Sequence, residues 1–136
     1  MRVLMFGGRN FNDYESVCRN WDHFERDHGP ITGVIHGDAR GADRCCAWVG
    51  YFKGVPLYPF PAECDNLTLP GCVVKHQRRS GRPYNATAGH FRNQEMIDIG
   101  LPSWGMGFPG GSGTADMADR LLSARIPIWD AGYIGW

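Results

Sequence analysis

The sequence has no long apolar run and no excess of either charge. No stretch of about 18 consecutive apolar residues occurs, so no membrane-spanning helix is predicted. The N-terminal run, residues 1–6, is stopped by two glycines and is shorter than a signal peptide requires. Lys and Arg number 14, as do Asp and Glu, so the formal net charge is zero. A protein that holds nucleic acid by bulk positive charge is therefore not expected, but a local site for a small phosphorylated ligand is compatible with this balance.

The five cysteines form neither a disulfide framework nor a zinc motif. Their number is odd, one pair is adjacent, and no Cys-x-x-Cys occurs. Three of them fall on apolar helical positions, which indicates small core residues: Cys18, Cys45 and Cys46. No set of His, Cys and carboxylates has metal-ligand spacing, so we expect no metal and no cofactor. The expected location is a reducing cytoplasm.

The 136 residues are typical of one domain, and the pattern along them alternates between strand and helix. Short apolar runs predict strands at residues 2–6, 33–36, 55–60, 104–108 and 126–129. Apolar residues at helical spacing predict helices at 13–28, 42–53, 88–99 and 114–124, the first capped by Asn12 with Glu15. This alternation predicts an α/β fold: a single Rossmann-like domain, residues 1–136, with a mainly parallel sheet of about five strands and helices on both faces.

One segment, at about residues 62–87, does not fit the alternation. It is rich in Pro, Gly and Asn and carries a basic run at residues 75–82. A connection of this length inside a compact domain is typically functional or disordered. Two readings stay open with equal weight: a solvated loop, or a lid that closes over an anionic ligand.

The strongest motif is the run Pro109-Gly110-Gly111-Ser112-Gly113-Thr114, between a predicted strand and a predicted helix. Glycines allow the backbone to approach a ligand closely, and the N–H groups at a helix start favour an anion. Ser112 and Thr114 add hydroxyl donors. The run is not a Walker A motif, because no Lys follows the last glycine. It predicts a phosphate-binding loop; a turn that only caps the helix is the less favoured alternative.

A second motif, His36-Gly37-Asp38-Ala39-Arg40-Gly41-Ala42-Asp43, joins the second strand to the second helix. Arg40 is a candidate phosphate ligand, or it pairs with Asp38 or Asp43. Asp43 is a candidate ligand residue, or only an acceptor at the helix start. A buried, hydrogen-bonded His36 is favoured over a catalytic one.

Two weaker motifs complete the candidate site. Gly7-Gly8-Arg9 follows the first strand, and Arg92-Asn93 opens the third helix. The alternatives are a surface salt bridge for Arg9 and a solvated first helical turn for Arg92 and Asn93. In parallel sheets ligands bind at the carboxyl ends of the strands, where these loops meet. The residues expected to bind ligand or phosphate are therefore Gly8, Arg9, Gly37, Asp38, Arg40, Asp43, Asn93, Gly110, Gly111, Ser112, Gly113 and Thr114.

Taken in order along the chain, these four motifs resemble the YspA-type branch of the SLOG superfamily. The resemblance implies a Rossmann-like fold and a ligand that is a nucleotide or is derived from one. It also implies a bacterial protein, or a phage protein that works in the host cytoplasm.

The Arg92-Asn93 motif and the glycine-rich run at residues 109–114 are also similar to motifs of the LOG phosphoribohydrolases. Those enzymes split a nucleoside monophosphate into free base and ribose 5-phosphate. That resemblance assigns catalytic roles to Arg92, at a helix start, and to Asp116, the first acid after the Gly-Thr pair. Two positions depart from the LOG pattern: the acid is Asp rather than Glu, and Met117 stands where a second acid is found. Both departures bear on catalysis rather than on nucleotide binding.

The favoured function is therefore nucleotide binding with phosphoribohydrolase-like cleavage of an N-glycosidic bond. The alternative is a sensor or sponge that binds an NAD-derived or ADP-ribose-like nucleotide without turning it over. DNA binding, by analogy with the DprA members of the superfamily, is a third and unfavoured reading because of the zero net charge. The aromatic C-terminal residues 129–136 are expected to pack on their own domain or on a second copy, and we expect a homodimer or higher homo-oligomer.

Overall fold

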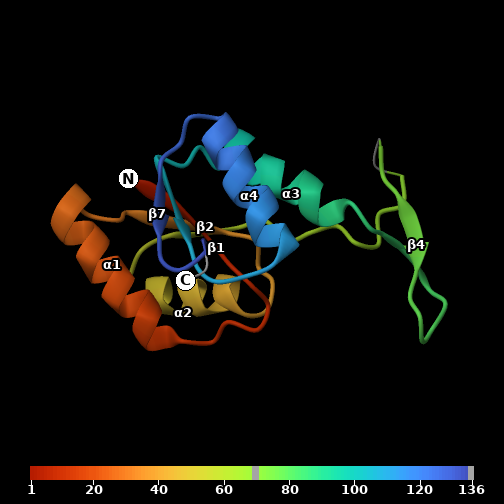
Figure 1. Ribbon diagram of the computed structural model, residues 1–136, viewed down its shortest axis with the longest axis horizontal. Coiled ribbons are helices and arrows are strands. Elements are labelled where there is room, and N and C mark those ends of the chain that lie inside the picture. The colour runs from red at the N-terminus through yellow and green to blue at the C-terminus, as the bar shows by residue number, and fades with distance from the viewer. Residues whose placement is uncertain (69–70, 135–136) are drawn as a thin grey trace.

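The computed structural model describes residues 1–68 and 71–134. Five strands form a parallel sheet in the order β3-β2-β1-β6-β7. Helices cover both of its faces, and a two-stranded hairpin projects from one end (Figure 1). In chain order the elements are β1 (Arg2–Phe6), α1 (Tyr14–His28), β2 (Gly33–His36), α2 (Ala42–Phe52), β3 (Leu57–Pro59), β4 (Val74–His76), β5 (Pro83–Asn85), α3 (Ala88–Asp98), β6 (Trp104–Gly107), α4 (Ser112–Ser123) and β7 (Ile128–Asp130). The predicted α/β fold with a parallel sheet is confirmed.

The central strand β1 divides the core into two halves. Its side chains alternate between the faces of the sheet, as they do in any strand. Val3 and Met5 join the cluster beneath α1 and α2, while Leu4 and Phe6 join the cluster beneath α3 and α4. Val3, Leu4 and Met5 are fully buried, which is why this strand reads as a continuous apolar run.

Helix α1 shows how the apolar spacing in the sequence becomes packing. Val17, Trp21 and Phe24 lie on one face of the helix and are buried against the sheet. The predicted cap was off by one residue. The side chain of Asp13, not of Asn12, accepts the hydrogen bond from the Ser16 amide at 3.0 Å.

The order of the strands creates a switch point at the centre of the sheet. The chain adds β2 and then β3 on one side of β1, and then returns to add β6 and β7 on the other side. The loops that leave β1 and β6 therefore diverge at the carboxyl edge, the position where ligands bind in open parallel sheets.

The segment at residues 62–87 contains regular structure. Strands β4 and β5 pair antiparallel, with Val74 opposite Asn85 and His76 opposite Pro83. The hairpin extends away from the sheet and the helices that cover it (Figure 1). The residues of the basic run, 75–82, are all exposed. Periodicity did not reveal these strands because each is only three residues long.

Within the described part of the chain, none of the helices has the length and apolar character needed to cross a membrane.

Candidate functional site

A cavity of about 550 Å³ opens at the carboxyl edge of the sheet, beside the switch point. Its walls come from the loops after β1 and β2, from helices α3 and α4, and from the two ends of the segment that carries the hairpin. The residues that line it are Phe6, Gly7, Gly8, Arg9, Ala39, Asp43, Ala62, Cys64, Tyr84, Asn85, Ala86, Gly89, His90, Arg92, Asn93, Met96, Gly111, Ser112, Gly113, Thr114 and Met117.

The loop between β6 and α4 is fastened to the loop after β1. The Gly8 amide donates to the Pro109 carbonyl at 2.8 Å. The backbones of the two loops approach each other so closely that a Cβ on Gly8 would lie 2.8 Å from Gly110 Cα. A Cβ on Gly110 would lie 2.6 Å from the Gly8 nitrogen. Glycine at both positions is therefore a steric requirement of this contact.

The first turn of α4 faces the cavity without a side-chain cap. The N-cap residue is Gly111, and no side chain hydrogen-bonds to the free amides there. Ser112 and Gly113 are exposed, Thr114 is buried, and all three line the cavity. Free N–H groups at the positive end of a helix are a suitable site for a phosphate or carboxylate group.

Arg92 crosses from α3 to the loop after β2. Its Nη1 donates to the Gly37 carbonyl at 2.5 Å and to the Phe60 carbonyl at 3.4 Å, and its Nε donates to Asn93 Oδ1 at 3.1 Å. These bonds fix the guanidinium at the wall of the cavity and leave further N–H groups for a ligand.

Asp43 is a buried carboxyl group in the wall of the same cavity. Its residue is 7% exposed, and its Oδ2 accepts from the Ala39 amide at 3.3 Å. Burial raises the pKa of Asp43 to about 6; the Arg92 charge and the amides of Ala39 and Gly37 oppose this shift. A carboxyl group that titrates near neutral pH in a cavity is a common feature of functional sites.

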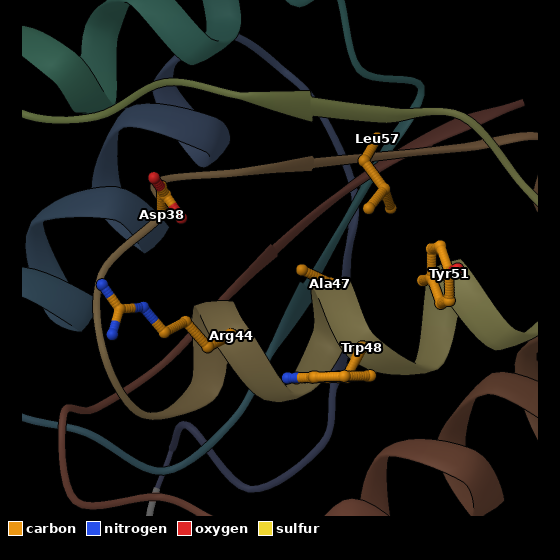
Figure 2. A pocket seen from close by; sticks show the side chains of 6 residues that line it. All are labelled: Asp38, Arg44, Ala47, Trp48, Tyr51 and Leu57. Carbon is orange, nitrogen blue, oxygen red and sulfur yellow. The ribbon is translucent and has the colours of Figure 1, made fainter.

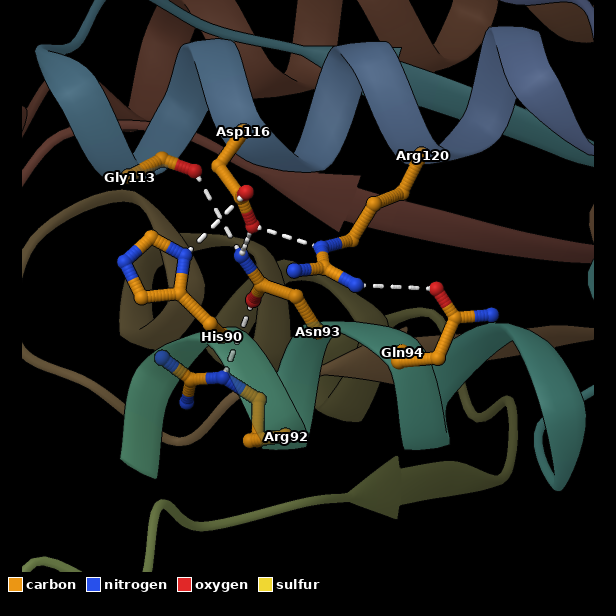
Figure 3. Close-up of polar contacts among 7 residues, drawn as sticks. All are labelled: His90, Arg92, Asn93, Gln94, Gly113, Asp116 and Arg120. Atoms are coloured by element: carbon orange, nitrogen blue, oxygen red, sulfur yellow. Dashed lines mark hydrogen bonds and ion pairs between the residues drawn. The ribbon is translucent and has the colours of Figure 1, made fainter. Parts of the chain in front are cut away.

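Asp116 stands beside the cavity rather than in its wall, in the contact between α3 and α4 (Figure 3). Its carboxylate accepts from Arg120 Nε at 2.8 Å and from Asn93 Nδ2 at 3.0 Å, and it lies 3.1 Å from His90 Nδ1. Burial alone would raise the pKa of Asp116, but the hydrogen bonds from Arg120, Asn93 and His90 outweigh it and lower the pKa. Arg120 also donates to Gln94 at 3.0 Å, so the two helices are joined by one polar network.

The structure brings most of the predicted ligand residues together. Those that line the cavity are Gly8, Arg9, Asp43, Asn93, Gly111, Ser112, Gly113 and Thr114. Arg92, one of the two residues predicted to be catalytic, lines it as well. Gly37 and Gly110 lie immediately behind the wall, where they allow the close contacts of Arg92 and Gly8. Arg40 is exposed and is absent from both the lining residues and the ion pairs of the described chain.

His36 is a buried, hydrogen-bonded residue, as the sequence favoured. It is 3% exposed, and its Nδ1 accepts from the Asp38 amide at 3.1 Å. Burial lowers the pKa of His36; the charge of Asp38 opposes this shift and that of Arg92 adds to it.

Asp38 belongs to a different hollow, which lies along α2 and β3. This hollow, of about 390 Å³, is lined by Asp38, Arg44, Ala47, Trp48, Tyr51 and Leu57 (Figure 2). Trp48 and Tyr51 are 52% and 68% exposed, so the hollow is a groove on the surface of α2.

Sequence reasoning missed part of the wall. His90 contacts Asp116 and lines the cavity, and its place two residues before Arg92 was the available signal. Cys64 and Tyr84 gave no such signal, because only folding of the segment at 62–87 places its two ends at the cavity. Asn85 ties these ends together, since its amide donates to the Cys64 carbonyl at 2.6 Å and its Nδ2 to the Asn66 carbonyl at 3.0 Å.

A parallel sheet with a cavity at its switch point and an uncapped helix start beside it defines a nucleotide-binding type of Rossmann-like fold. Residues 1–66 match the family model described as YAcAr, the YspA, cpYpsA-related SLOG family, and this match confirms the resemblance to the SLOG superfamily. The match ends before the Pro-Gly-Gly-Ser-Gly-Thr loop, whose LOG-like character stays a prediction. No curated protein matches the sequence significantly.

Solved structures resemble the whole fold at low sequence identity. DNA processing protein A (DprA) from Streptococcus pneumoniae superposes with a TM-score of 0.64 at 14% identity, and MurG from Acinetobacter baumannii with 0.53 at 11%. Both alignments cover 95% of this chain, but only 49% of DprA and 33% of MurG. At these identities the likeness concerns the fold alone.

Proposed function

We propose that this protein binds a nucleoside phosphate in the cavity at the switch point, with the phosphate on the first turn of α4. The observation that carries the proposal is the convergence of Gly8, Arg9 and residues 111–114 on one cavity. Backbone amides and one arginine meet the phosphate charge there, so no metal is required. Arg92 and Asn93, which line the same cavity from α3, are placed to contact the sugar or the base.

The proposed reaction is hydrolysis of the N-glycosidic bond, as the LOG resemblance implies. Water adds to the anomeric carbon, the bond from that carbon to the base breaks, and its electron pair leaves with the base, which takes up a proton. The products are free base and ribose 5-phosphate. Such cleavage develops positive charge on the sugar, so a nearby carboxylate favours it. In this proposal Asp116 supplies that charge next to His90 and Asn93, which line the cavity.

One observation favours the alternative, a sensor or sponge that binds a nucleotide signal such as an NAD-derived or ADP-ribose-like ligand. The carboxylate of Asp116 already contacts Arg120, Asn93 and His90 and lies outside the cavity wall. A carboxylate so engaged is a good support for two helices and a poor reactant. Under this alternative the cavity holds an intact ligand.

Mass spectrometry of the protein incubated with nucleoside mono- and diphosphates, NAD and ADP-ribose tests both readings. Free base and ribose 5-phosphate that accumulate with time would establish the hydrolase. An intact nucleotide recovered from the heat-denatured complex, without products, would establish the binding protein. If no nucleotide is bound or consumed, both readings are wrong. A variant with Arg9 and Arg92 both changed to Ala is the control for binding in this cavity.

We also propose a homodimer. Tyr133, from the aromatic C-terminal residues, packs on Phe6 of its own domain with ring centroids 5.9 Å apart, while residues 135–136 lie outside the described part of the chain. Helix α2 offers a different face beside the groove, since the rings of Trp48 and Phe52 stack with their centroids 5.5 Å apart and Phe52 is 76% exposed. Light scattering should give the mass of two chains, and Phe52→Ser should lower it. An unchanged mass in the variant would exclude this face.

A further inference from the structure

The positive charge of the chain is concentrated on one projecting element. Residues 71–85 contain four basic side chains and no Asp or Glu: Lys75, Arg78, Arg79 and Arg82. The rest of the chain therefore has ten Lys and Arg against fourteen Asp and Glu. The zero net charge, which made a nucleic-acid partner unexpected, conceals this separation.

The element is the β4–β5 hairpin, residues 74–85, called the basic hairpin below. It stands clear of the sheet and its helices (Figure 1). Every residue from 74 to 83 is exposed. Arg82 lies 3.3 Å from Asp65, an exposed pair that solvent screens, and no ion pair of the described residues involves Lys75, Arg78 or Arg79.

The tip of the basic hairpin is held by its own hydrogen bonds. The Gln77 amide donates to the Arg82 carbonyl at 2.9 Å, and the Gly81 amide donates back to the Gln77 carbonyl at 2.9 Å. At the base, the Ala86 amide donates to the Val73 carbonyl at 2.8 Å. The charges are thus carried on a formed two-stranded ribbon, which reduces the entropy lost when a partner binds.

We propose that the basic hairpin is a docking surface for double-stranded DNA. A two-stranded ribbon fits the major groove of B-form DNA. Arginine, the commonest side chain at this tip, is the preferred partner of phosphate groups and of guanine. The major groove of an RNA duplex is too narrow and deep for side chains to enter.

The composition of the tip argues against other polyanions. Single-stranded nucleic acid is held by stacking on aromatic rings. The aromatic residues of the basic hairpin are His76 and Tyr84, and Tyr84 lines the cavity rather than lying at the tip. Membrane-surface elements insert bulky apolar side chains, whereas residues 77–82 are Gln, Arg, Arg, Ser, Gly and Arg. The polar, arginine-rich tip matches a surface that offers hydrogen-bond acceptors.

The test measures binding of the full chain to a short fluorescent DNA duplex by anisotropy at several salt concentrations. Four phosphate contacts predict a slope of about −3.6 for log affinity against log salt. Raising the salt from about 50 to about 200 mM should then weaken binding roughly 100-fold. The double variant Arg78→Ala/Arg79→Ala should halve the slope and weaken low-salt binding at least ~10-fold.

The matched control is Arg19→Ala/Arg26→Ala, which removes the same charge from exposed positions on α1. It should bind the duplex within about twofold of the unchanged protein. An equal loss in both variants would mean that bulk charge alone acts, and would overturn the proposal. So would the absence of salt-dependent binding, or tighter binding to a single strand or to vesicles containing phosphatidylserine. Because both arginines lie outside the cavity, nucleotide binding should be unchanged in Arg78→Ala/Arg79→Ala whichever way the DNA test falls.

Discussion

The guanidinium of Arg92 and the carboxyl group of Asp43 both lie against Gly37, at the place where a side chain on that residue would be. A Cβ on Gly37 would lie 2.7 Å from Arg92 Cζ and 2.8 Å from Asp43 Oδ2. Two motifs that are far apart in the sequence, residues 36–43 and residues 92–93, thus converge at a position without a side chain. Arg92 does not form a direct ion pair with Asp43. Burial raises the pKa of Asp43, and the positive charge of Arg92 partly offsets this rise.

Gly37→Ala is expected to separate these two groups. The added methyl group must displace the guanidinium or the carboxyl, and such overpacking costs about 1–3 kcal/mol of unfolding free energy. Nucleotide affinity should fall as well, because Arg92 is moved from the cavity wall. Urea denaturation and ligand titration measure the two effects.

The same substitution made in an Arg92→Ala background tests whether contact with the guanidinium causes the loss of stability in Gly37→Ala. With the guanidinium absent, Gly37→Ala should cost less than in the unchanged protein, since only the contact with Asp43 remains. The same cost in both backgrounds would show that Gly37 acts through the backbone instead.

Asp43→Asn is expected to stabilise the protein at neutral pH. The pKa of Asp43 is about 6 in the folded protein against 3.8 for the free group, so the folded state binds the proton more tightly. The free energy of unfolding therefore falls as the pH rises from about 4 to about 6. Above that range the ionised Asp43 lowers it by about 3 kcal/mol in full. Asn carries no charge, so the variant should gain roughly 1–3 kcal/mol at pH 7 and nothing near pH 4.

Denaturation at several pH values shows whether the gain in stability of Asp43→Asn comes from removing the titrating carboxyl group or from a change that does not depend on pH. Asp119→Asn, at an exposed position on α4, is the matched control and should leave stability nearly unchanged at both pH values. A gain for Asp43→Asn that does not depend on pH would contradict the assigned titration.

The elements of the sheet and its helices could be predicted because their signals are local. The predicted strand at residues 33–36 and the predicted helix at 42–53 agree with β2 and α2 to within a residue. Burial on both faces makes each central strand an apolar run, and burial of one helix face produces the spacing of Cys45, Cys46 and Val49.

The site was less predictable because it depends on distances across the fold. The glycine loops could be assigned to the carboxyl edge by topology alone, and Gly8, Arg9 and Thr114 do line the cavity. The position of Asp116 could not be predicted, because each step of one residue turns the side chain by about 100° around the helix and so decides whether it faces the cavity or the neighbouring helix. The hairpin and the cavity wall at Cys64 depend on long-range contacts that leave no periodic pattern.

Asp116→Asn should separate the hydrolase from the binding protein. If Asp116 supplies negative charge to the reaction, release of free base should fall at least ~100-fold while nucleotide affinity stays within a few fold. The variant also weakens the contacts with Arg120 and His90, which should cost about 1 kcal/mol of stability. Product release, affinity and unfolding are therefore measured together, with Asp119→Asn as the control. Unchanged release of base would remove Asp116 from the reaction.

Gly110→Ala should disrupt the phosphate loop, whereas Gly113→Ala should not. A Cβ on Gly110 would overlap the Thr114 hydroxyl and approach the Gly8 nitrogen to 2.6 Å, so the contact between the two loops must open. We expect a loss of about 1–3 kcal/mol in stability for Gly110→Ala. Gly113, in the first turn of α4, has open space around its Cβ position, and alanine there should stabilise the helix by roughly 0.5–1 kcal/mol. Thermal or urea denaturation of the two variants gives the comparison directly. Both changes add one methyl group within the run of residues 109–114. Opposite effects on stability would therefore show that the close approach of Gly8 and Gly110, and not a general preference for glycine in this run, shapes the cavity.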